Sequence, residues 1–361
     1  MWEVIKFDNE NKQIFIDKEK ETNIIAPMYI GNKRYKIESI LSNSGGFGVI
    51  YNAIDTKLRN RKVLIKALKY KPSIFKDSHN NLDELKEKIL NIRQTAENEY
   101  KTLIYLKKGK EARMPSIIDV IYDESPQLIA CSNISKDISN SEPYIIMQKV
   151  PGVTFNDMIK DGDIDTLIKT KGYKSRRDWE LEAMSYGYQI ATILGNFHKR
   201  EIYEGKQSYF VYQDLKPDNI ILSYDRTITL LDFGGMIRVK EVIIDGEINT
   251  VTNDDLGNPG VGTVGYQAQE VEKNCYTIDE RADIFSLGAI LFYLLTGIKP
   301  SKIITKVDER LPVEVLKNNY NKSTYEIIKK CTEIDREDRY KNMEELKLKI
   351  RDSFKEIKNS N

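Results

Sequence analysis

The chain has 361 residues, with 56 Lys and Arg against 55 Asp and Glu, so its formal net charge is +1. This length predicts two domains or one large two-lobed unit, and the balanced charge gives no electrostatic reason to expect nucleic acid as a partner. Hydrophobic residues make up 40% and charged residues 31%, which suits a large core and excludes a disordered chain. No apolar run reaches the ~20 residues of a membrane span, and we expect no secretory signal at the N-terminus.

The cysteines and histidines narrow the chemistry further. The three cysteines, Cys131, Cys275 and Cys331, are far apart and form no C-x-x-C pair, which indicates free thiols in a reducing, cytoplasmic compartment. Only two histidines are present, so an H-E-x-x-H zinc site is excluded and a serine–histidine mechanism is disfavoured. Acid–base chemistry must therefore fall to carboxylates, lysines or a bound metal.

The first 150 residues are predicted to be rich in strands. Residues 1–33 contain short apolar patches that predict two or three strands, which we interpret as an N-terminal β extension. A helix is expected at 82–107, because its apolar residues recur about every 3.5 positions. The other expected strands are Tyr35–Leu41, Val49–Ile54, Lys62–Leu68, Ile117–Tyr122, Gln127–Cys131 and Tyr144–Val150.

Pro151-Gly152 breaks this pattern and marks the predicted domain boundary. We therefore divide the chain into the extension 1–33, a β-rich lobe at 34–150 and a second lobe at 151–361. The second lobe is mainly helical, with short strands and a Gly/Asp/Asn-rich stretch between its second and third helices, so the fold class is α+β. Its expected helices are at about 154–160, 178–200, 281–296, 324–334 and 343–357.

A glycine-rich turn, Gly45-Gly46-Phe47-Gly48, lies between two predicted strands. Glycines let backbone N–H groups approach an anion closely, although an ordinary hairpin turn has the same composition. Lys66 ends an apolar strand one hairpin later, where it is either an edge residue reaching water or a phosphate-binding ammonium.

Glu99 interrupts the apolar stripe of the long predicted helix. A carboxylate on a buried stripe needs a cation as partner, and Lys66 is the economical candidate. A slip of the register would instead leave Glu99 in water, with Glu97 as the alternative partner.

Two further strings carry carboxylates near short strands. Asp214, Lys216 and Asn219 share one loop before a strand, and Asp232 follows the next strand in the string Leu-Asp-Phe-Gly. Hard oxygen ligands separated by one hairpin can converge, which suits Mg²⁺ carrying a phosphate. Each acid could separately be a turn residue, but the two strings together favour a phosphate site.

Taken in order, these motifs resemble the eukaryotic-type (Hanks-type) protein kinase family, in its serine/threonine branch. The resemblance covers about residues 34–345, and the joint signature is specific although its glycine loop alone is not. It implies a bilobal fold, with a β-rich lobe carrying one long helix and a mainly helical second lobe. The bias toward Lys, Asn, Ile and Tyr is typical of an AT-rich genome, and we expect a bacterial source.

The resemblance implies the following roles in the second lobe. Asp214 would accept or orient the proton of the substrate hydroxyl, and Lys216 would stabilise the transferring phosphoryl group. Asn219 and Asp232 would hold Mg²⁺. The substrate would be a protein Ser or Thr hydroxyl.

For ATP, the resemblance implies that Lys66 contacts the phosphates and pairs with Glu99, while Met147 occupies the gatekeeper position of the inter-lobe hinge. The residues implied to contact the nucleotide are Gly45, Gly46, Phe47, Gly48, Ile50, Leu64, Lys66, Met147, Gln148, Val150 and Ile221.

The resemblance also implies contacts that shape the peptide-binding side. The stretch 262–270 would close the activation segment and receive the peptide. Glu270 would pair with Arg339, and Asp283 would anchor the catalytic loop.

Several positions depart from the family pattern. Leu64 replaces the usual alanine over the adenine ring, and Gln269 replaces the usual proline before Glu270. Gln213 replaces the arginine that normally pairs with an activation-loop phosphate, and a neutral amide cannot substitute for it. We therefore expect activity to depend little on activation-loop phosphorylation.

Other features leave alternatives open. The span 232–270 is long and rich in small and acidic residues, which suggests a mobile loop, and the insertion at 204–209 has no assigned role. The helix 82–107 could pack on its own lobe or against a second chain in a homodimer. A small-molecule phosphotransferase and a catalytically dead pseudokinase scaffold remain alternatives to an active kinase.

Overall fold

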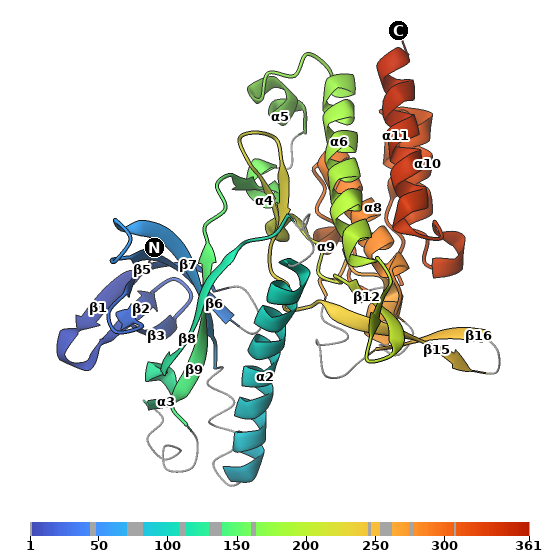
Figure 1. Cartoon of the computed structure of the whole chain (residues 1–361). Helices are drawn as coiled ribbons and strands as arrows, with labels where there is room; N and C mark the ends of the chain where they lie inside the picture. The colour runs from blue at the N-terminus through green and yellow to red at the C-terminus, as the bar shows by residue number, and fades with distance from the viewer. Residues whose placement is uncertain are drawn as a thin grey trace. The chain divides into compact units, whose positions relative to one another are not determined.

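The computed structural model divides the chain into two compact units. The first contains residues 1–104 and 115–149, and the second contains residues 105–114 and 150–361. A β-rich first unit and a mainly helical second unit confirm the expected α+β class (Figure 1). The structure describes residues 2–43, 48–70, 82–107, 113–129, 139–159, 164–244, 247–252, 262–273, 278–306 and 308–360, so Gly45, Gly46 and Phe47 lie outside the described residues.

A six-stranded antiparallel sheet forms the centre of the first unit, in the order β4-β5-β6-β7-β9-β8. Alternating side chains of its strands face the core, as the period of a strand requires; Tyr51, Val63 and Ile65 are examples. Its strands are β4 (Tyr29–Ile30), β5 (Tyr35–Ser42), β6 (Gly48–Asp55), β7 (Arg61–Leu68), β8 (Ile117–Glu124) and β9 (Ser141–Gln148).

The N-terminal residues form a second, three-stranded sheet made of β1 (Glu3–Phe7), β2 (Lys12–Asp17) and β3 (Thr22–Pro27). Phe15 of β2 belongs to the same buried cluster as the central sheet, and its ring centroid lies 6.0 Å from that of Tyr51. The N-terminal sheet is therefore an additional layer of the first unit, packed on its central sheet.

The long helix α2 spans Leu82–Lys107, as predicted. Its buried residues Leu85, Ile89 and Ala96 pack with Leu68 of β7. The strand expected at 127–131 is wrong: Pro126–Ile129 form the short helix α3. Proline suits the first turn of a helix because its missing N–H has no intrahelical partner there.

Helices dominate the second unit (Figure 1), and nearly all residues of α8 are buried. The apolar residues of α8 lie on all sides of the helix, which is typical of a helix at the centre of a protein. Gly297 ends the helix with φ 70°. In the described residues no helix is long and apolar enough to cross a membrane. The helices are α4 (Phe155–Met158), α5 (Ile164–Thr170), α6 (Arg176–Phe197), α7 (Gln269–Lys273), α8 (Arg281–Thr296), α9 (Pro300–Ile303), α10 (Lys322–Cys331) and α11 (Met343–Asn359).

Two small sheets complete the second unit. One has the order β10-β13-β14 and the other β11-β12-β15-β16, all antiparallel. Their strands are β10 (Val153–Thr154), β11 (Glu201–Tyr203), β12 (Lys206–Val211), β13 (Ile220–Leu222), β14 (Ile228–Leu230), β15 (Ile237–Ile244) and β16 (Glu247–Thr252).

The second of these sheets corrects the expectation of a mobile loop for part of the span 232–270, while residues 245–246 and 253–261 of that span lie outside the described residues. The hairpin of β15 and β16 occupies much of that span, and β15 pairs with β12 in the register Val211 opposite Ile237. The 204–209 insertion supplies the turn after β11 and most of β12. The β12–β15 pairing that joins the two hairpins connects segments far apart in the chain, so composition alone did not reveal the sheet.

Candidate active site

The first unit contains a buried ion pair between β7 and α2. The Nζ atom of Lys66 lies 2.7 Å from Oε1 of Glu99, whose side chain is 6% exposed. Gly48 allows this arrangement, because a Cβ atom there would lie 3.2 Å from Cε of Lys66 and 3.1 Å from the carbonyl oxygen of Ala67. The expected pairing of Lys66 with Glu99 is therefore confirmed.

Other residues implied to contact the nucleotide lie on the central sheet of the first unit. Ile50 on β6 and Leu64 on β7 are half-buried, and Leu64 stands opposite the buried Met147 of β9. Gln148 is exposed, and its N–H donates to the carbonyl oxygen of Ser116 at 2.8 Å. The second unit contains Val150 and Ile221, both half-buried.

The loop after β12 is held by Asp283, which is fully buried in α8. The Oδ2 and Oδ1 atoms of Asp283 accept hydrogen bonds from the N–H groups of Tyr212 and Gln213, each at 2.9 Å. Nε2 of His198 lies 2.8 Å from Oδ2 of the same carboxylate. The anchoring contact expected of Asp283 is thus present, whereas no sequence pattern indicated the bond to His198.

Asp214 lies at the centre of a polar cluster in this loop. Its Oδ2 atom lies 2.6 Å from Nζ of Lys216 and accepts from Nδ2 of Asn219 at 3.1 Å. Its Oδ1 atom accepts from the hydroxyl of Thr263 at 3.1 Å. Burial raises the pKa of the Asp214 carboxyl above its ordinary value, although the charge of Lys216 acts in the opposite direction.

The pairing of β13 with β14 places Asn219 and Asp232 at the same end of these two strands. The N–H of Leu231, directly before Asp232, donates to the carbonyl oxygen of Asn219 at 2.8 Å. Because Nδ2 of Asn219 donates to Asp214, its amide oxygen is the atom left to act as a ligand.

This donor set fits Mg²⁺. An amide oxygen and a carboxylate are hard ligands, and Mg²⁺ is usually held by one or two carboxylates together with substrate phosphates rather than by a protein cage. The described part of the chain contains no cluster of three or more His, Cys, Asp or Glu side chains that could hold a metal.

Aromatic contacts fix the segment that follows Asp232. The ring of Phe233 packs edge-on against Tyr212 and Phe197, with centroid separations of 5.4 Å and 5.9 Å. These three rings are buried, so the residue after Asp232 is held in the core of the second unit.

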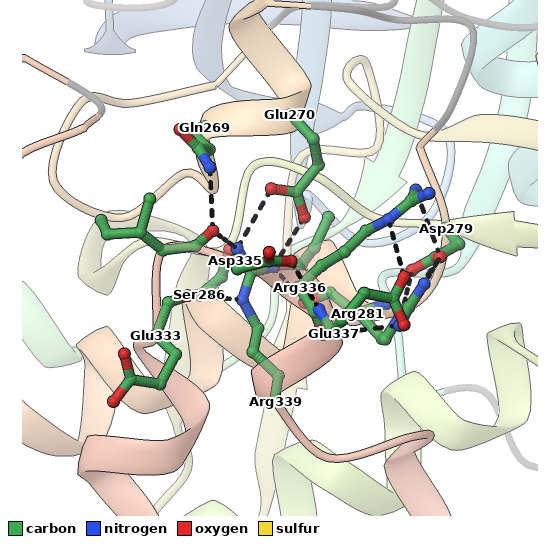
Figure 2. Close-up of polar contacts among 12 residues, drawn as sticks. Gln269, Glu270, Asp279, Arg281, Ser286, Glu333, Asp335, Arg336, Glu337 and Arg339 are labelled. Atoms are coloured by element: carbon green, nitrogen blue, oxygen red, sulfur yellow. Dashed lines mark hydrogen bonds and ion pairs between the residues drawn. The ribbon is translucent and has the colours of Figure 1, made fainter.

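The expected pair of Glu270 and Arg339 is present and belongs to a larger network (Figure 2). Arg339 is buried and donates to both Glu270 oxygens, at 2.6 and 3.1 Å. It also donates to the carbonyl oxygens of Glu333, Ile334 and Arg281. This network fixes the C-terminal end of the segment 262–270 to α8 and to the residues before α11.

Gln269 contributes to the same region through a contact that the sequence did not suggest. Its Nε2 atom donates to the carbonyl oxygen of Ile334 at 3.0 Å (Figure 2). A proline at this position could not make this bond, so the departure from the family pattern adds a link to the segment.

Comparison with known proteins identifies the family. A family model described as "Protein kinase domain" matches residues 38–349. A probable serine/threonine-protein kinase of Clostridium acetobutylicum is 27% identical over 337 residues, covering 91% of this chain and 40% of the relative. One of Clostridium perfringens is 25% identical, covering 88% of this chain and 38% of the relative.

Shorter matches reach other organisms. A serine/threonine-protein kinase of Mycolicibacterium smegmatis is 30% identical over 159 residues, covering 44% of this chain and 20% of the relative. The chain thus spans about 40% of the length of the clostridial relatives.

Proposed function

The chain belongs to the protein kinase family, and from this premise we propose that it transfers the γ-phosphate of ATP to Ser or Thr hydroxyls of proteins. The observation that carries the proposal is the cluster around Asp214, in which a buried carboxylate contacts Lys216, Asn219 and Thr263. Names of the clostridial relatives support serine/threonine specificity.

In this proposal Asp214 accepts the proton of the attacking hydroxyl, since its carboxylate is held in a fixed orientation. Lys216 is close enough to share the same site and would neutralise charge on the transferring phosphoryl group. Asn219 and Asp232 would hold Mg²⁺, which supplies charge neutralisation of the phosphates when bound.

The first unit would contribute the nucleotide contacts. Lys66, oriented by Glu99, would contact the ATP phosphates. Leu64 and Met147, opposite one another on β7 and β9, would contact the adenine. We further propose a cytoplasmic location, protein partners with Ser or Thr acceptors, and assembly as a homodimer. We also propose the boundaries 1–33 for the N-terminal extension, 34–150 for the first lobe and 151–361 for the second lobe.

The test is incubation of the purified protein with labelled ATP, Mg²⁺ and a generic basic protein, beside the Asp214→Asn variant. We expect the unmodified protein to label Ser or Thr residues, and the Asp214→Asn variant to produce no label. Nucleotide binding without any labelled protein would contradict the proposal and favour a pseudokinase scaffold. Label on a small molecule alone would favour a small-molecule phosphotransferase.

A further inference from the structure

Gln213, directly before Asp214, has an unusual combination of backbone and side-chain properties. It is 1% exposed and has φ 64°, a left-handed conformation that non-glycine residues rarely adopt. Its N–H donates to Asp283. The backbone conformation is therefore held by the fold, and it fixes the direction in which the side chain leaves the loop.

The side chain of Gln213 reaches the segment that follows Asp232. Its Nε2 atom donates to the carbonyl oxygen of Gly235 at 2.6 Å. Gly235 lies in a turn closed by the hydrogen bond from the N–H of Met236 to the carbonyl oxygen of Phe233, at 3.1 Å. Gln213 thus links the strand end before Asp214 to the turn after Asp232.

This link continues a backbone ladder. The pairing of β12 with β15 ends at Val211 opposite Ile237, two residues before Gln213 and two residues after Gly235. Beyond that point the amide side chain takes the place of the next backbone hydrogen bond. The two carboxylates Asp214 and Asp232 both lie just past this extended ladder.

Packing alone does not explain an amide at this position. The Oε1 atom of Gln213 is buried and, among the described residues, has no hydrogen-bond partner, which destabilises the folded state relative to an apolar side chain of equal length. The orientation of the amide is set by Gly235, because only Nε2 can donate to a carbonyl oxygen. The NH2 group of the side chain is therefore the part that forms a hydrogen bond in the structure.

We propose that Gln213 is a positioning residue that holds the 233–236 turn through Gly235, and thereby sets Asp232 relative to Asp214 without any phosphorylated residue. The proposal rests on the kinase function proposed above. In this proposal the hydrogen bond from Gln213 to Gly235 is permanent, and it orders the start of the activation segment.

The test compares Gln213→Met with Gln207→Met, which makes the same chemical change at an exposed position of β12. Two quantities are measured: hydrogen–deuterium exchange of the amides of residues 233–237 without nucleotide, and the Mg²⁺ concentration that gives half-maximal phosphorylation. For Gln213→Met we expect exchange about tenfold faster, the size of one lost neutral hydrogen bond, and a several-fold higher Mg²⁺ requirement. The KM for ATP should change less than twofold, and Gln207→Met should match the unmodified protein.

The outcomes separate this proposal from the function on which it rests. Unchanged exchange in Gln213→Met overturns the proposal, whatever its phosphorylation rate. If the unmodified protein transfers no phosphate, the proposed function fails, while the exchange comparison still decides whether Gln213 holds the turn. If Gln213→Met does not fold, Gln213→Asn replaces it, because Asn tolerates the left-handed backbone but is one methylene too short to reach Gly235.

Discussion

The ammonium of Lys66 and the carboxylate of Glu99 form a direct contact of 2.7 Å inside the first unit. This contact decides between the two glutamates of α2 that the sequence left open. Glu97, two residues earlier, accepts from the hydroxyl of Tyr122 at 2.8 Å and pairs with Lys101. The carboxylate on the buried stripe is thus the one that orients Lys66.

We predict that Glu99→Gln lowers kcat/KM by up to about 100-fold, because Lys66 loses the carboxylate charge that orients it toward the phosphates. Glu97→Gln makes the same change on the same helix and should stay within about twofold. Steady-state kinetics with ATP and a basic protein measure both. An equal loss of kcat/KM in the two variants would show that the contact between Glu99 and Lys66 has no particular role in the reaction.

For Asp214 we predict that Asp214→Asn lowers kcat by roughly 100- to 10,000-fold, the usual contribution of a proton acceptor. Burial raises the pKa of this carboxyl. In a plot of rate against pH, the fall in rate on the acid side should therefore be centred at a pH above the ordinary pKa of an aspartate. Below that pKa the carboxyl keeps its proton and cannot accept another, so the rate falls as the pH decreases. Asp218→Asn, at an exposed position of the same loop, is the control and should retain the full profile.

Activity is predicted to be independent of phosphorylation in the activation segment. Gln213 has no charge for a phosphate, and its amide is already bonded to Gly235. Thr250→Ala and Thr252→Ala should therefore keep rates within about threefold, since no charge-assisted bond to a phosphate is lost. A collapse of the rate in either variant argues against this view. Thr263→Ala should slow the reaction for another reason, since its hydroxyl donates to Asp214.

The fourth prediction concerns stability. Arg339→Met removes a buried cation, breaks the ion pair with Glu270 and removes hydrogen bonds to the carbonyl oxygens of Glu333, Ile334 and Arg281, so the free energy of unfolding should fall by about 3–5 kcal/mol. Arg336→Met breaks the longer, partly exposed pairs with Asp279 and Glu337 and should lower the free energy of unfolding by less than about 1 kcal/mol. Urea unfolding of both variants, followed by circular dichroism, measures the difference; similar losses would refute it.

Local pattern predicted much of the framework. The helix at 82–107 was predictable because apolar residues recur at helical spacing along nearly its whole length, apart from Glu99. Gly297 ends α8 where the sequence places its end, because glycine adopts φ 70° without strain. In contrast, the short apolar run at 127–131 fits a strand as well as a helix, and the position of Pro126 decided for a helix.

The sequence by itself determined the residue types of the candidate site and their order, since Lys66, Asp214, Asn219 and Asp232 stand in recognisable motifs. Only the tertiary structure decided which atoms meet. The β12–β15 pairing and the bonds from His198 to Asp283 and from Gln213 to Gly235 each join residues at least 22 positions apart. Such contacts depend on how helices and strands pack. A periodic pattern indicates which face of a segment is buried, but it does not indicate which distant segment packs on that face.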